Sequence, residues 1–121
     1  YPDVQDIEWS QKGVYYVADC WVNGSELDVW FDANANWIMT EMEIFREQLP
    51  AAVNTAYEES GYGDWVIDNL TKLTFPYKSE EFVFEVQRGA QERALYYSAY
   101  GGLLLEKDIT DADDTHWPDV E

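Results

Sequence analysis

The chain has 121 residues, 46% of them hydrophobic and 17% aromatic, so it is long and apolar enough to fold as one domain without disulfides or a structural metal. Its 25 acidic and 7 basic residues leave a net charge of −18, which excludes the basic surface that nucleic-acid-binding proteins need. No apolar run is long enough to insert into a membrane, and the chain shows no signal peptide.

A strand over residues 4–9 and then a hairpin are the first elements that the sequence predicts. Two apolar-rich runs, 14–22 and 25–32, flank Asn23-Gly24, and this dipeptide favours a tight type I′ turn. The register that the turn sets places Cys20 opposite Leu27, and the other pairs on that side beyond the turn are also apolar or aromatic. We therefore expect this side of the hairpin to face the core.

The opposite side of the hairpin carries the candidate partner-binding residues. Its register places Asp19 directly opposite Asp28, a like-charge pair that costs roughly 0.2–1 kcal/mol. Such a pair suits a bound cation or an incoming Lys or Arg, although both carboxylates are also compatible with simple hydration. Exposed Trp and Tyr are typical interface anchors, unless helices cover this side and make them core. The predicted partner-binding set is Tyr15, Asp19, Trp21, Asp28 and Trp30.

The stretch from Asp32 to Glu43 resembles a calcium loop in its spacing. Asp32, Asn34 and Asn36 occupy the first, third and fifth places of an EF-hand loop, and Glu43 occupies the twelfth. The sixth place, which requires glycine, holds Trp37, and the flanking residues are typical of strands. The main interpretation is a turn, in which Asp and Asn bond nearby backbone N–H groups. A looser calcium site formed by Asp32, Asn34 and Asn36 remains the alternative.

The second half of the chain repeats the pattern of the first. An apolar stripe at helical spacing over residues 49–61 predicts a helix, and residues 65–75 follow as a strand. Two strand-like runs then flank Gly89-Ala90, and this hairpin lies 66 residues after the first one. The sequence therefore predicts an α+β fold of two tandem helix-plus-antiparallel-sheet repeats, about 1–44 and 47–109. Each helix would pack on one sheet face, and the first helix would be missing from the chain.

The acidic tail, 110–121, supplies a second calcium candidate in Asp111, Asp113 and Asp114. A solvated end of the chain is the simpler interpretation. The sequence offers no recognisable set of catalytic residues. The only histidine is His116 in this tail, and the only cysteine, Cys20, points to the predicted core. We therefore predict that the protein is not an enzyme.

Five short motifs stand out along the chain: Tyr1-Pro2-Asp3, Ile7-Glu8-Trp9, Tyr15-Tyr16-Val17-Ala18, Trp30-Phe31-Asp32-Ala33-Asn34-Ala35-Asn36-Trp37 and Leu49-Pro50-Ala51-Ala52-Val53. Together they resemble the PepSY-like proteins of Bacteroidetes, which are related in fold to the β-lactamase-inhibitor proteins. The resemblance implies one PepSY-like domain over 1–121 that is periplasmic or secreted, its signal peptide removed, and that binds or inhibits other proteins without catalysis. The predicted function is docking of a protein or basic peptide on an acidic, aromatic-rich sheet face. The alternative is a calcium-binding or calcium-responsive periplasmic protein, with calcium as the candidate cofactor.

Overall fold

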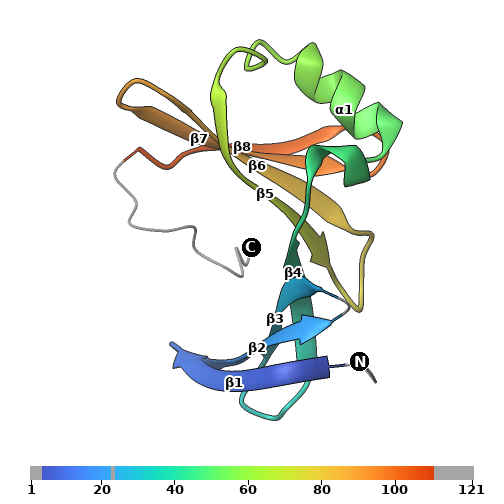
Figure 1. Cartoon of the computed structure of the whole chain (residues 1–121), viewed down its shortest axis with the longest axis vertical. Coiled ribbons are helices and arrows are strands. Elements are labelled where there is room, and N and C mark those ends of the chain that lie inside the picture. The colour runs from blue at the N-terminus through green and yellow to red at the C-terminus, as the bar shows by residue number, and fades with distance from the viewer. Residues whose placement is uncertain (1–3, 23, 111–121) are drawn as a thin grey trace.

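A single antiparallel sheet of eight strands, in which each strand pairs with the next in the chain, dominates the fold (Figure 1). The computed structural model describes residues 4–22 and 24–110. The connection between β4 and β5 holds a short 3₁₀ helix, η1 (Arg46–Gln48), and an α-helix, α1 (Ala51–Glu58). The strands are β1 (Val4–Lys12), β2 (Tyr15–Val22), β3 (Ser25–Phe31), β4 (Trp37–Glu43), β5 (Val66–Thr74), β6 (Glu81–Arg88), β7 (Gln91–Ser98) and β8 (Leu103–Asp108).

The prediction of two tandem helix-plus-sheet repeats is wrong. Strand β4 pairs directly with β5, with Thr40 opposite Thr74 and Glu43 opposite Thr71, so both halves belong to one open sheet. Within residues 4–22 and 24–110, α1 is the only α-helix. Pairing β4 with β5 gives hydrogen-bond partners to backbone groups that two separate sheets would leave along unpaired edges.

The two predicted hairpins are confirmed in position and register. Cys20 lies opposite Leu27 and Asp19 opposite Asp28 in the first hairpin. Phe84 lies opposite Leu95 in the second. Their tight turns are local signals, and the strand register follows from the turn.

The face of the sheet that α1 covers, here called the helix face, holds the largest core cluster. Val53 and Tyr57 of α1 are completely buried. The Tyr57 ring stacks on Phe84 with centroids 4.3 Å apart, and Phe84 meets Tyr97 edge-on at 5.6 Å. This packing explains why a helix of only eight residues holds its place, since short helices depend on tertiary contacts.

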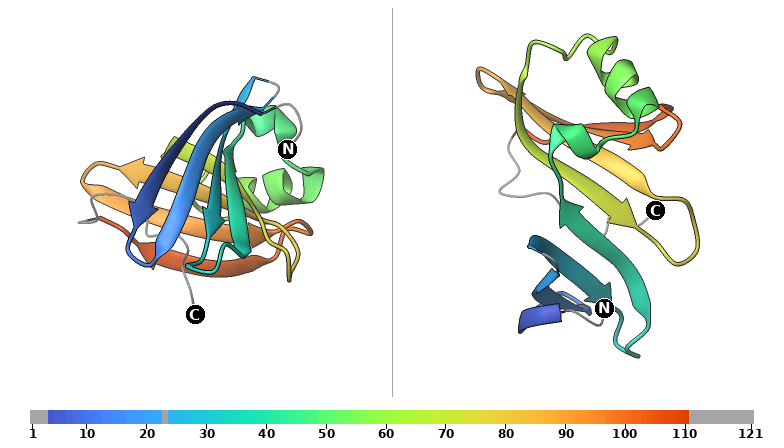
Figure 2. Two further views of the ribbon diagram at one scale, coloured as in Figure 1. Left: turned by 90° about the horizontal axis from the view of Figure 1, so that it is seen from below. Right: turned by 45° about the vertical axis from the view of Figure 1, so that its right-hand side comes forward.

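The opposite face, here called the inner face, is more buried than the sequence predicts. Val17 and Trp30 lie on it and are each only 2% exposed, whereas Tyr16, which was expected to face the core, is 42% exposed. The sheet is strongly twisted and curled (Figure 2). Apolar side chains of six successive strands thereby form a second core cluster, which comprises Val17, Trp30, Met39, Leu73, Val83, Ala94 and Tyr96. The expectation that one face of the hairpin is core and the other open was therefore wrong for Val17, Trp30 and Tyr16.

Candidate functional site

Four carboxylates cross the inner face side by side, one from each of the strands β1 to β4. Glu8 lies opposite Asp19, Asp19 opposite Asp28, and Asp28 opposite Glu41. We call these four residues the carboxylate row. Because cross-strand partners share a face, all four side chains emerge on the inner face.

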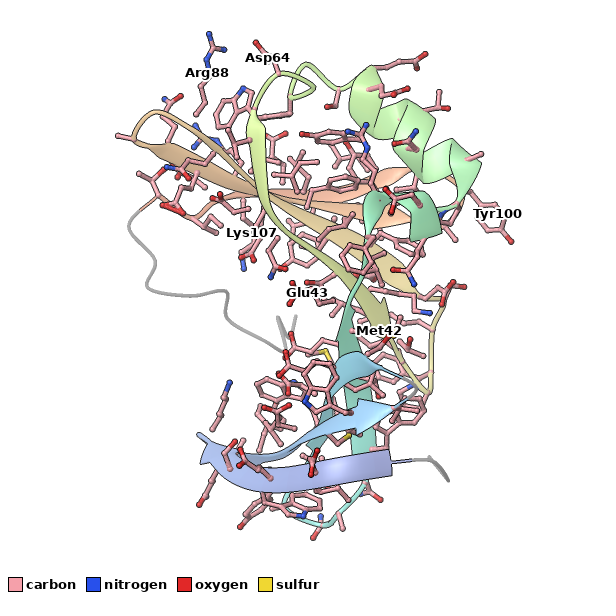
Figure 3. The ribbon with its side chains drawn as sticks, in the orientation of Figure 1. Met42, Glu43, Asp64, Arg88, Tyr100 and Lys107 are labelled. Atoms are coloured by element: carbon pink, nitrogen blue, oxygen red, sulfur yellow. The ribbon has the colours of Figure 1, made fainter. Side chains whose placement is uncertain are left out.

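A small hollow lies at the Glu41 end of the carboxylate row. Its volume is about 140 Å³, and its lining is almost entirely polar. Figure 3 shows Glu43 of β4 and Lys107 of β8 directed into the space between the two halves of the sheet. The residues that line the hollow are Glu26, Asp28, Glu41, Glu43, Asn69 and Thr71.

Trp30 holds Glu41, at the β4 end of the carboxylate row, in position. Its indole Nε1–H donates a hydrogen bond of 2.9 Å to Oε1 of Glu41. The Tyr15 ring packs edge-on against Trp30 at 5.9 Å, and the Lys12 ammonium lies 5.5 Å from the centre of the Trp30 ring. Trp30 is therefore a buried support for Glu41. Its indole N–H, the only polar group of the side chain, provides a hydrogen bond to the Glu41 carboxylate.

Burial and mutual repulsion raise the pKa values of Asp28 and Glu41, two members of the carboxylate row. Loss of hydration raises the pKa of Glu41 to about 7, and the Asp28 charge adds to the rise. Burial also raises the pKa of Asp28, as does Asp19 beside it, while Lys12 acts in the opposite direction. Asp28 is the direct cross-strand partner of both Glu41 and Asp19. The row is thus an electrostatically strained group that a positive charge would relieve.

The predicted partner-binding residues fall into two groups in the structure. Asp19 and Asp28 are brought together on the inner face, with Trp21 nearby on β2 and 45% exposed. Tyr15 is half-buried, and Trp30 is buried beneath the row. The structure therefore leaves Trp21 as the exposed aromatic anchor of the predicted set.

Sequence reasoning missed Glu8 and Glu41, which extend the Asp19–Asp28 pair on both sides. Extending the register of the first hairpin to its neighbouring strands would have found them. Register shifts hide the extension, because β1 is irregular between Gln5 and Glu8 and the β3–β4 pairing shifts beside Trp30.

The loop from Asp32 to Asn36 uses its aspartate to brace its own backbone. Oδ1 of Asp32 accepts hydrogen bonds from the backbone N–H groups of Asn34 and Asn36, at 2.8 and 2.9 Å. Oδ2 accepts a third, from the side-chain amide of Asn36 at 3.1 Å. These bonds lower the pKa of Asp32. The arrangement is the Asx-type turn that the main sequence interpretation predicts.

The calcium interpretation stays a prediction. Across the part of the chain that the structure describes, no group of three or more His, Cys, Asp or Glu side chains is arranged to hold a metal ion. The tail candidates Asp111, Asp113 and Asp114 lie outside the described residues.

Replacing Asp32 by Ala is expected to lower the melting temperature by a few degrees, because three N–H groups lose their acceptor. The measurement is thermal unfolding with and without calcium, and Asn34→Ala, which keeps the Asp32 carboxylate, is the control. An increase in the wild-type melting temperature with calcium that Asp32→Ala abolishes would identify the loop as a calcium site.

The described residues form an open, curled antiparallel sheet of eight strands braced by one α-helix, with acidic groups on the inner face. The family model described as "Putative beta-lactamase-inhibitor-like, PepSY-like" matches residues 14–105. The chain therefore belongs to this family, as the sequence motifs predict.

Solved structures from three Bacteroides species share this fold. A crystal structure of a BLIP-like protein from Bacteroides fragilis NCTC 9343 is 55% identical and superposes with a TM-score of 0.91, covering 99% of this chain and 86% of the other. A structure titled "putative periplasmic proteins", from Bacteroides eggerthii DSM 20697, is 32% identical with a TM-score of 0.89, covering 94% and 84%. A DUF2874 family protein from Bacteroides ovatus ATCC 8483 is 31% identical with a TM-score of 0.89, covering 94% and 83%.

A search of curated proteins found no match to the chain. In the described residues, no helix combines the length and the apolar character that crossing a membrane requires.

Proposed function

We propose that this protein is a non-catalytic, inhibitor-like binding protein of the bacterial periplasm, and that its inner face docks a protein or peptide through basic side chains. Family membership supports the inhibitor-like part of the proposal, because the family description and the Bacteroides fragilis relative both carry that name. The description of the Bacteroides eggerthii relative supports the periplasm.

The carboxylate row is the observation that carries the proposal. Four acids stand on adjacent strands, although like charges placed opposite one another destabilise a sheet. The ion pairs found among residues 4–22 and 24–110 join Arg46 to Glu58, Lys78 to Glu81, and Arg93 to Asp108, and none of them reaches the row. A partner that supplies Lys or Arg would recover the energy that this repulsion costs.

Trp21 supplies an apolar contact beside the charges. It is 45% exposed and lies opposite Glu26, so a docked side chain would meet an indole ring next to a carboxylate. Lys and Arg side chains suit such a surface, since their stems pack on aromatic rings while their charged ends reach the acids. The net charge of −18 would also speed the approach of a basic partner at low salt.

The cysteine of the chain argues for binding rather than catalysis. Cys20 is buried at 3% exposure, and burial raises the pKa of its thiol, with Asp19 and Asp28 adding to the rise. A thiol that is neutral and shielded from solvent is a poor nucleophile.

Neutralising the inner face is expected to abolish partner binding. The triple variant Asp19→Asn, Asp28→Asn and Glu41→Gln should capture at least tenfold less of its partner from envelope extract than the wild type does. The matched control removes three exposed acids outside the inner face, by Glu47→Gln, Glu59→Gln and Asp64→Asn, and should bind like the wild type. Equal losses in both variants would show that only the net charge matters and would refute docking at this face.

A further inference from the structure

We propose that docking on the inner face is linked to a proton: Asp28 and Glu41 together hold one proton near neutral pH, and this proton leaves when a basic group docks. The inference rests on the proposed function and adds the regulation of that same surface. It makes the acidity of the surroundings a control on binding.

The geometry of the pair favours a shared proton. Asp28 and Glu41 are direct cross-strand partners on one face of the sheet, and both line the small hollow. Two carboxylates this close are difficult to keep charged at once, whereas one proton between them makes an O–H···O hydrogen bond. Trp30 donates its N–H to Oε1 of Glu41, so the second oxygen of Glu41 remains the one that can carry a proton.

The charged side chains around Asp28 and Glu41 are mostly negative, which favours the protonated form of the pair. Strand β5 contributes only the neutral groups Asn69 and Thr71 to the hollow. Behind them Glu85 of β6 accepts a 3.0 Å hydrogen bond from Asn69. Lys12 opposes the trend and lowers the pKa values of Asp28 and Glu41. Lys107 of β8 is a second positive charge directed into the same space (Figure 3). The charged groups on the strands around the pair are thus Glu8 and Lys12 of β1, Asp19 of β2, Glu26 of β3, Glu43 of β4, Glu85 of β6 and Lys107 of β8.

A docked ammonium or guanidinium group would reverse this balance. It places a positive charge beside the pair, lowers the pKa of both acids and releases the shared proton. Binding and proton release are then coupled, so a higher proton concentration weakens binding. For one proton with a pKa of about 7, affinity falls about tenfold between about pH 8 and about pH 6.

The test uses hexalysine as the basic probe and the full chain as it exists. Calorimetric titrations at about pH 8 and about pH 6, each in two buffers with different ionisation enthalpies, measure affinity and proton release together. The wild type is expected to bind hexalysine about tenfold more tightly at the higher pH and to release about one proton at the lower pH. Glu41→Gln keeps an oxygen that accepts from Trp30 but cannot titrate, so its affinity should change little with pH. Glu47→Gln, which removes an exposed acid outside the inner face, is the matched control and should keep the wild-type dependence.

The outcomes separate this inference from the proposed function. Equal wild-type affinity at both pH values, or an unchanged pH dependence in Glu41→Gln, would overturn the proton linkage and leave docking at the inner face intact. Absence of hexalysine binding at the higher pH and low salt would count against the proposed function, and the linkage would fall with it. Carboxyl carbon NMR shifts of Glu41 and Asp28 give a probe-free check, since the pair should titrate near neutral pH.

Discussion

Raising the pH from about 5 to about 8 is expected to destabilise the protein by roughly 2.5 kcal/mol. In the folded chain, burial raises the pKa of Glu41 from 4.5 to about 7. Between these values the folded state keeps a proton that the unfolded state has lost, so the free energy of unfolding falls as pH rises. The contribution is fully present below about pH 4.5 and is lost as pH passes through about 7. Asp28, whose pKa is also raised, acts in the same direction.

The variant Glu41→Gln should remove most of this slope and should be more stable than the wild type at about pH 8. The amide keeps an acceptor for the Trp30 N–H and carries no charge to repel Asp28. Urea unfolding at several pH values measures the free energies, and Trp30 next to Glu41 provides a fluorescence signal. Glu47→Gln, at an exposed position outside the inner face, is the control and should keep the wild-type slope. A wild-type stability that is flat or rises with pH in this range would contradict the assignment.

Tight turns made the local geometry of this chain predictable. Asn23-Gly24 and Gly89-Ala90 each set a register, and from the first register the Asp19–Asp28 contact followed without any coordinates. The helix was also predictable, since Val53 and Tyr57 lie one turn apart in an apolar stripe and are both buried. These features depend on residues close together in sequence.

Features that depend on distant pairing were not predictable from the sequence. Thr40 of β4 pairs with Thr74 of β5, but the connection between these strands contains a helix. No short turn motif in the sequence therefore indicates that the two strands pair and join the two halves of the sheet. The curl of the sheet is also a collective property, and it buries Trp30 on a face that alternation alone marks as exposed. Extending the hairpin register to β4 brings Glu41 next to Asp28, but its burial and its bond to Trp30 depend on how β4 pairs with β3 and β5 and were not predictable.

The turn after β7 approaches the first turn of α1 closely at Gly101. Gly101 has a φ of +88°, a conformation that favours glycine. A Cβ at this position would lie 2.6 Å from the backbone oxygen of Ala52, in the first turn of α1. The backbone N–H of Gly101 also donates to the Ser98 carbonyl at 3.0 Å, which limits how far the turn can move.

Gly101→Ala is therefore expected to destabilise the protein by about 2–5 kcal/mol, the sum of backbone strain and a clash that the helix must relieve. Gly89→Ala is the matched control, because Gly89 has a φ of +61° but a Cβ at this position would meet no atom within 4 Å; it should cost only about 1 kcal/mol. Urea unfolding gives both free energies, and hydrogen exchange over α1 tests whether the helix loosens first in Gly101→Ala. Equal costs for the two variants would show that the close approach of this turn to Ala52 does not position α1.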